Sequence, residues 1–438
     1  MSQEGLGLLL VGAVFVAIFL GFPIAFTLVL LGILFGWLGF GDLVFDLMVY
    51  QVFQTMTEST LAAVPLFLFM GYLLERAGLM ERLFNAFQLL LGPVRGSLYI
   101  GTLAVATLFA AATGIVGASV SIMGLMAAPV MRAAGYDTRL SAGSIAAGGT
   151  LGILIPPSVM LVVMGPVLQV SVVRLFAAAI LPGLLLSALF IFYTMMRSYL
   201  DRSIGPPLPP ELRATSLLPV IRELLFGIVP PGVLVAATLG SILAGLATPT
   251  EGAAMGAFGA LLLVAAFGKL TVYSLRDAVY RTALIASMIL VLVAASNFFG
   301  AVFSRLGTPI MIAEGLLAFD LAPTAFIFAL LAVIFILGWP LEWVPIVVII
   351  LPIFLPLIRE LEFNLVWIGT LVAVTLQTAW LSPPVALSAY FLKGVAPEWD
   401  LKDIYLGMLQ FMVLQLIGVV ALVFFPQIAL WLPGVLFD

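Results

Sequence analysis

Residues 148–158 read GGTLGILIPPS, a break rich in glycine and proline inside an otherwise apolar segment. In a lipid bilayer a broken helix leaves backbone amide and carbonyl groups without partners, at several kcal/mol each, unless protein, water or a ligand satisfies them. A second break, LSPP at residues 381–384, interrupts another apolar segment near the other end of the chain. One proline pair in a membrane helix is often only a kink, but two pairs in matching surroundings favour a shared functional cavity.

The composition identifies the broader class. Of the 438 residues, 64% are hydrophobic and 9% are charged, and the mean hydropathy is +1.28. These polar residues are too few to form the water-facing surface of a soluble globular protein. The chain is therefore expected to be a polytopic membrane protein in the lipid bilayer. Cysteine and histidine are absent, which excludes disulfides, thiol chemistry, haem and most zinc sites. The N-terminal MSQE lacks the positive region of a signal peptide, and no basic run suggests nucleic acid.

The distribution of basic residues predicts the topology, because loops rich in Lys and Arg face the cytoplasm. It predicts about ten full spans plus two re-entrant hairpins, with both termini on the side of the membrane that faces away from the cytoplasm. Residues 41–60 contain acidic but no basic residues and are expected to form a loop on that same side. Residues 197–222, the only substantial polar linker, carry four arginines and are expected in the cytoplasm.

Two further apolar segments are predicted to be the hairpins. Residues 98–130 are broken at 112–119 (ATGIVGAS) and have arginines on both flanks, so they are expected to enter from the cytoplasm and return to it. Residues 323–356 are broken at 338–342 (GWPLE) and are expected to enter from the outside.

The two halves of this pattern form an internal repeat. A shift of 227 residues places Pro156 on Pro383 and Arg132 on Arg359. The order of features also matches: a hairpin, a basic turn, a broken span with two prolines, and a final span. Because the two copies enter from opposite sides, the expected fold is an all-α polytopic membrane protein with an inverted repeat, two re-entrant hairpins and two broken helices. This architecture is typical of secondary transporters.

The breaks supply candidate ligands for a cation. An ion such as Na⁺ needs several oxygens at one point, and unwound carbonyls with hydroxyls or amides supply them without burying a charge. Each hairpin tip is expected to face one broken span, which gives two half-sites. In the first half-site the candidates are Thr113, Gly114, Gly117, Ser119, Gly149, Thr150 and Gly152. In the second they are Gly338, Glu342, Thr375, Gln377, Thr378 and Ser382. The alternative for the small residues is plain helix packing.

A substrate cavity is expected between the half-sites, where exposed helix N-termini would favour an anionic group. The candidate lining residues are Ser119, Pro156, Pro157, Ser158, Asn297, Pro383 and Pro384. Asn297 could equally form only an interhelical hydrogen bond, and Glu342 could either ligate a cation or cap a helix. Glu251 follows Thr248-Pro249-Thr250, which fits a capping box with proline at the first helical position, so its expected role is structural.

Several short motifs occur together along the chain. YD at 136–137, VRLF at 173–176 and LPG at 181–183 surround the first break, and TPTEGAA at 248–254 and LSPPV at 381–385 follow. In combination they resemble the large membrane subunit (M subunit) of tripartite ATP-independent periplasmic (TRAP) transporters. The resemblance implies sodium-driven, elevator-type uptake of an organic acid (a carboxylate). It also implies two partners, a separate small four-helix membrane subunit and a periplasmic substrate-binding protein, and no cofactor besides Na⁺ as the coupling ion.

The resemblance further implies a fixed scaffold and a moving transport domain. The scaffold comprises residues 1–95 and, with the linker and interface helices, residues 197–318. The transport domain comprises the first repeat, residues 96–196, and the second, residues 319–438. Two departures from the family pattern are Leu341-Glu342-Trp343, where many relatives have Asp-Pro, and Ser382, where Thr is common.

Other functions are considered as well. A self-sufficient sodium/anion symporter of related fold would need no binding protein, and a purely structural membrane subunit would transport nothing. An intramembrane enzyme is disfavoured, because without Cys, His or a pair of intramembrane aspartates the chain lacks a nucleophile, a metal site and an acid–base pair. The chain is therefore expected not to be an enzyme.

Overall fold

The computed structural model describes residues 2–114, 116–209, 213, 217–317, 322–339, 341, 343–383 and 386–437. These residues are helical or irregular, with no strand among them. The N-terminal part contains α1 (Gln3–Phe19), α2 (Ile24–Phe40), α3 (Leu43–Thr57), the 3₁₀ turn Ser59–Ala62, α4 (Ala63–Arg76) and α5 (Leu79–Leu91). The first repeat contains α6 (Ser97–Thr113), α7 (Val116–Ala133), α8 (Thr138–Thr150), the 3₁₀ turn Leu151–Ile153, α9 (Val159–Leu168) and α10 (Val172–Leu200).

The second half of the chain is also helical. The middle part contains α11 (Leu217–Leu243), α12 (Pro249–Ala266), α13 (Val272–Arg305) and α14 (Thr308–Leu317). The second repeat contains α15 (Pro323–Leu337), α16 (Trp343–Pro345), the π-helical turn Ile346–Ile350, α17 (Leu351–Glu360), α18 (Leu365–Thr378), α19 (Leu387–Val395), α20 (Leu401–Phe424) and α21 (Gln427–Phe437).

The helices differ in whether they are long enough to cross a membrane. Seven described helices are long and apolar enough to cross a membrane, or eight if the pair Leu43–Thr57 and Ser59–Arg76, bent by 56°, is one span. The expected count of about ten full spans is higher, because the predicted broken spans each consist of two short helices and because α1, α2 and α4 are shorter than 18 residues. Two of the seven long helices, Val116–Ala133 and Trp343–Glu360, belong to the predicted hairpins. α1 and α2 have 17 residues each, so each reaches only about 25 Å of a core that is about 30 Å thick.

The expected periplasmic loop at residues 41–60 is wrong, because α3 occupies most of it. Asp42 precedes the helix, Asp46 lies in its first turn, and Glu58 follows its last residue with extended backbone. The acidic residues thus flank an apolar stretch that is long enough to form four helical turns. The lack of basic residues gave no information on whether the segment was helical.

The first break has a defined local structure. α8 begins after Asp137, whose Oδ1 accepts a hydrogen bond from the backbone N–H of Leu140 (2.8 Å), and it ends at Thr150. After one 3₁₀ turn, Ser158 donates to the carbonyl oxygen of Ile153 and caps α9 by accepting from the N–H of Leu161 (3.4 Å). One hydroxyl therefore satisfies both sides of the break, as the apolar surroundings require.

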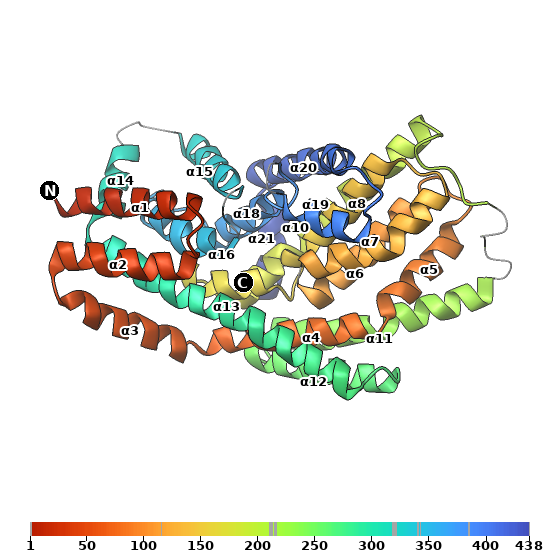
Figure 1. Cartoon of the computed structure of the whole chain (residues 1–438), viewed down its shortest axis with the longest axis horizontal. Coiled ribbons are helices and arrows are strands. Elements are labelled where there is room, and N and C mark those ends of the chain that lie inside the picture. The colour runs from red at the N-terminus through yellow and green to blue at the C-terminus, as the bar shows by residue number, and fades with distance from the viewer. Residues whose placement is uncertain are drawn as a thin grey trace.

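The helices pack in groups that cross the chain order. α13 packs against α2, α3 and α4, and α4 packs against α12. In Figure 1, α1, α2, α3 and α14 gather at one end of the molecule, and α13 runs from that end along one side. α20, the longest helix of the predicted second repeat, packs on α8 of the first and on α18 of the second. The two repeats therefore share one core.

Glycine allows the close approach of α20 to α8. A Cβ atom at Gly407 would lie 1.9 Å from the carbonyl oxygen of Arg139, and one at Gly143 would lie 2.5 Å from the ring of Phe411. Small residues at such crossings let the backbones approach closely, as is common between membrane helices. The register that results places Gln415 of α20 beside the end of α8.

We predict that Gly407→Ala destabilises the protein, because overpacking a close contact costs about 1–3 kcal/mol, and here the atom in the way is backbone. The midpoint of thermal unfolding of the purified protein in detergent should fall. The matched control is Gly300→Ala on α13, where an added methyl group meets nothing within 4 Å. Its midpoint should stay or rise, since alanine is the better helix former. An unchanged midpoint for Gly407→Ala would contradict the close crossing.

Candidate functional site

The tip of the first hairpin lies against the first break. Gly114, between α6 and α7, has a φ of +61°, a backbone conformation that favours glycine. A Cβ atom there would lie 3.7 Å from the carbonyl oxygen of Pro157 and 4.0 Å from that of Gly152. Carbonyls of the break therefore face the hairpin tip. A Cβ atom at Gly149 would lie 2.3 Å from Val120 of α7, so the hairpin also packs on the last turn of α8.

The hydroxyls of this half-site are deeply buried. Thr150 and Ser158 are both 0% exposed, and Ser119 is buried too. Thr150 Oγ1 donates to the carbonyl oxygen of Ala147 (2.8 Å) and accepts from Gln415 Nε2 (3.1 Å). Gly117 is placed differently, because a Cβ atom there would meet the ring of Phe391 on α19. This is a packing contact.

The second half-site also brings the end of a hairpin arm close to a break. A Cβ atom at Gly338, at the end of α15, would lie 2.9 Å from Ala379 in the second break. Thr375 donates to Leu371 (2.8 Å), and Thr378 and Ser382 each donate to a carbonyl oxygen of the helix turn before it. These hydroxyls keep lone pairs for a ligand, since each uses only its hydrogen.

Some candidates fall elsewhere. Glu342, Pro384 and the side chain of Thr113 lie outside the described residues, while Pro156 and Pro157 are buried and Pro383 is half-buried. Glu251 forms a capping box: its N–H donates to Thr248 Oγ1 (3.2 Å), and its Oε2 accepts from the N–H of Thr248 (2.8 Å).

Asn297 lies apart from both breaks. Its Nδ2 donates to Thr55 Oγ1 (2.9 Å), which links α13 to α3. It also lines a cavity of about 150 Å³ whose other polar residues, Gln54 and Glu58, flank Thr55 at the end of α3. The opposite wall comes from α9 of the first repeat. Asn297 therefore faces the contact between the two predicted domains, and not the half-sites.

One residue of the site was missed. Gln415 of α20 is 0% exposed, and its Nε2 lies 3.1 Å from Thr150 Oγ1 and 3.3 Å from Gln377 Oε1. The sequence signal was a glutamine in an apolar span, which is costly to bury, although the same helix also contains Gln410. Its partners could not be inferred, because Thr150 lies 265 positions away along the chain.

The YD motif before α8 is structural. The ring of Tyr136 packs edge-on against Tyr99 at 4.8 Å between ring centroids, and its hydroxyl lies 3.2 Å from Ser97 Oγ. Burial raises the pKa of Tyr136, so the hydroxyl stays neutral at physiological pH. With Asp137 as N-cap, the motif fixes where the broken span begins.

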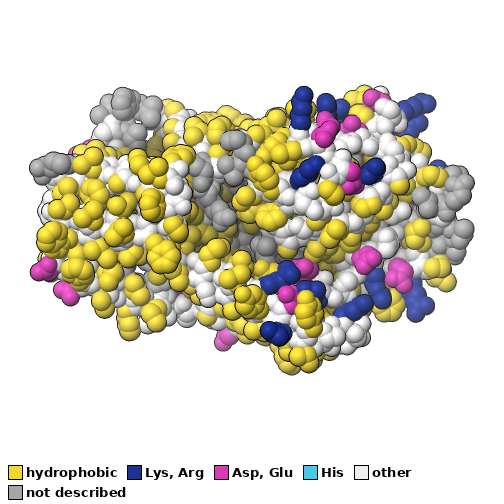
Figure 2. Space-filling model, viewed as in Figure 1, with side chains coloured by type: hydrophobic (Ala, Val, Ile, Leu, Met, Phe, Trp, Pro, Cys, Tyr) yellow, Lys and Arg dark blue, Asp and Glu magenta, His cyan; other side chains and the backbone are white. Residues whose placement is uncertain are grey.

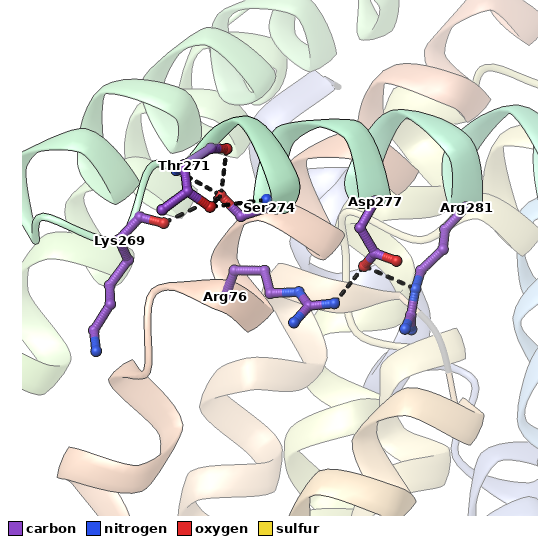
Figure 3. A network of polar contacts seen from close by, with 6 residues as sticks. All are labelled: Arg76, Lys269, Thr271, Ser274, Asp277 and Arg281. Atoms are coloured by element: carbon purple, nitrogen blue, oxygen red, sulfur yellow. Dashed lines mark hydrogen bonds and ion pairs between the residues drawn. The ribbon is translucent and has the colours of Figure 1, made fainter.

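A charged network lies at the start of α13 (Figure 3). Arg76, at the end of α4, pairs with Asp277, which also accepts from Arg281 Nε (3.0 Å). One helical turn earlier, Thr271 Oγ1 accepts from the N–H of Ser274 (3.0 Å) and caps the helix. The network joins the polar ends of two scaffold helices and does not reach the half-sites.

Comparisons with known proteins agree on one family. The family profile described as "Tripartite ATP-independent periplasmic transporter, DctM component" matches residues 11–428. The ectoine/5-hydroxyectoine TRAP transporter large permease protein UehC of Ruegeria pomeroyi is 30% identical over 427 residues, or 97% of each chain. The C4-dicarboxylate TRAP transporter large permease protein DctM of Pseudomonas aeruginosa is 29% identical over 385 residues, or 88% of each chain.

A third relative and one solved structure extend this picture. The sialic acid TRAP transporter large permease protein SiaM of Vibrio cholerae is 27% identical over 421 residues, covering 95% of this chain and 96% of its own. The crystal structure of the Alcanivorax borkumensis YdaH transporter, described as having an unusual topology, is similar with a TM-score of 0.63 at 14% identity, covering 90% of this chain and 89% of that one. The latter likeness concerns the fold alone. Since the family profile spans nearly the whole sequence, the chain belongs to the DctM family, the large permease subunits of TRAP transporters.

Proposed function

We propose that this chain is the membrane-translocating subunit of a sodium-coupled, binding-protein-dependent importer of an organic acid. The observation that carries the proposal is the paired contact of a hairpin tip with a helix break, Gly114 with the first break and Gly338 with the second. Both places gather buried hydroxyls, and the first also presents unwound carbonyls to the hairpin tip. Such oxygens are the ligands that suit Na⁺ in discontinuous membrane helices. No cofactor is needed besides the coupling ion.

The relatives support an acidic substrate. The names of three of them give C4-dicarboxylate, ectoine or 5-hydroxyectoine, and sialic acid as what those proteins transport. All three classes carry a carboxylate, which suits the helix N-termini that open at the breaks. These relatives are permeases and not enzymes, and we propose that this chain works in the same way, with a small four-helix membrane subunit and a periplasmic binding protein.

The surface charge supports the orientation that we propose. On the face shown in Figure 2, the described Lys and Arg side chains gather over one half of the molecule, whereas the opposite end shows acidic and apolar side chains. By the positive-inside rule, the basic half faces the cytoplasm, and the N-terminus, at the opposite end in Figure 1, is then periplasmic. The C-terminus is proposed on the same side because the predicted number of full spans is even. With this orientation the first hairpin is re-entrant from the cytoplasm and the second from the periplasm of the inner membrane.

We further propose an elevator movement of the two repeats against the scaffold. The packing of α20 on both α8 and α18 joins the repeats into one body. In the other group, α2, α3 and α4 pack against α13, and α12 packs against α4. The contacts between these groups include α4 with α6 and α9, and this is the surface along which the repeats would slide.

Uptake should require a sodium gradient. In proteoliposomes that contain this chain and its small subunit, with the binding protein added outside, uptake of a labelled C4-dicarboxylate, ectoine or sialic acid should stop when the sodium gradient is dissipated. Uptake driven equally well by a proton gradient alone would refute sodium coupling. Full uptake without the binding protein would instead favour a self-sufficient symporter.

Removing a hydroxyl at each break should weaken sodium binding. Thr150→Ala and Ser382→Ala should each raise the half-saturating sodium concentration about tenfold, a typical effect of disturbing a metal site. The matched control is Thr370→Ala, because Thr370 is also fully buried on α18 and donates to Val366 (2.9 Å), but two turns before the break. If the double variant at Thr150 and Ser382 kept the wild-type sodium dependence, the site assignment would be wrong.

Joining the two bodies should arrest transport. The chain has no cysteine, so pairs can be introduced cleanly. Phe67 of α4 and Phe176 of α10 lie 6.3 Å apart between ring centroids, across the proposed sliding surface. Cysteines there, joined by a short thiol cross-linker, should stop uptake while the binding protein still docks. The control pair is Phe328 and Phe424, 6.1 Å apart within the second repeat. Continued uptake after complete cross-linking of the first pair would refute the elevator.

A further inference from the structure

A single side chain connects the two half-sites. Gln415 Nε2 lies within hydrogen-bonding distance of Thr150 Oγ1, in the last turn of α8, and of Gln377 Oε1, in the last turn of α18. Each of these turns leads directly into one of the two helix breaks. Thr150, Gln377 and Gln415 are all 0% exposed. The bridge therefore runs from one inverted repeat to the other through the protein interior.

The packing of α20 on α8 fixes the position of Gln415. Gly407 and Phe411, two turns and one turn earlier on α20, fix the register against α8 through their contacts with Arg139 and Gly143. Met412 Sδ, on the neighbouring turn, lies 3.0 Å from Ser382 Oγ. This part of α20 thus contacts Thr150, Gln377 and Ser382, which are candidate ligands from both half-sites.

The contact between Gln415 and Gln377 stabilises the helix packing less than an apolar contact would. Gln415 Oε1 and Gln377 Nε2 are both buried, and neither has a hydrogen-bond partner among the described residues. A buried polar group without a hydrogen-bond partner costs more free energy than a hydrogen bond between two membrane helices contributes on average. A methionine of similar size would pack there without this cost. A role other than helix packing therefore accounts better for the amides of Gln377 and Gln415.

We propose that Gln415 is a positioning residue that couples ion binding at the two half-sites; this rests on the proposed sodium-coupled function. A cation that uses Thr150 Oγ1 as a ligand repels the Gln415 N–H group directed at the same oxygen. When that N–H group withdraws, Gln377 Oε1 is released as a ligand for the second half-site, and the partnerless Gln415 Oε1 can turn towards the cation. Occupancy of one half-site thereby raises the affinity of the other.

The test measures cooperativity in sodium. In Gln415→Met, which keeps the volume and removes both amide groups, the Hill coefficient for sodium-dependent uptake should fall towards 1 and the half-saturating sodium concentration should rise at least about fivefold, the lower end of typical coupling between sites. The matched control is Met408→Leu, a change at a fully buried position of α20 for which no polar contact is involved. It should keep both wild-type values.

The sodium dependence of thermal stability tests the same coupling without a transport assay, which matters if Gln415→Met folds poorly. Sodium titration of thermal stability in detergent can be made on Gln415→Leu and on the wild type, and the variant should lose the cooperative part of the sodium response. An unchanged Hill coefficient, or an unchanged cooperative stabilisation, would overturn the coupling while leaving sodium-driven transport intact. Sodium-independent uptake by the wild type would overturn the proposed function, and the coupling with it.

Discussion

The whole molecule depends on one constraint: inside a bilayer, every interrupted helix must find partners for its freed backbone groups. At the first break Ser158 bonds to one backbone group on each side, and the carbonyls of Gly152 and Pro157 face the hairpin tip at Gly114. At the second break Ser382 bonds back to Thr378, and a second hairpin ends at the same place. The contacts that satisfy the backbone groups of each break in the bilayer are thus the same contacts that bring oxygens together at the candidate ion sites.

Much of this arrangement could be predicted, because glycine and proline act locally. Proline removes a backbone donor, and a glycine such as Gly114 adopts a positive φ, so the positions of the breaks follow from the residues themselves. The repeat then pairs each break with a hairpin. The family, the all-helical class and the multi-pass membrane character are confirmed by the comparisons and by the fold, whereas the domain boundaries and the ion ligands stay predictions.

What could not be predicted depends on distant contacts. Gln415 is one amide in an apolar span, and nothing near it in the sequence indicates that Thr150 and Gln377 are its neighbours. Asn297 could be assigned to a cavity or to a helix contact, and the structure places it in both roles, but away from the breaks. The helix at Leu43–Thr57 was missed because its acidic flanks resemble a loop when charge alone is considered.

The double role of Ser158 has a consequence for selectivity. Because its hydroxyl bonds to the carbonyl of Ile153 and to the first turn of α9, the break is held by hydrogen bonds of its own. If the proposed cation binds there, less of its binding free energy is lost to ordering the chain. A site that is rigid before its ligand arrives can reject an ion of the wrong radius, since the oxygens do not close around whatever enters.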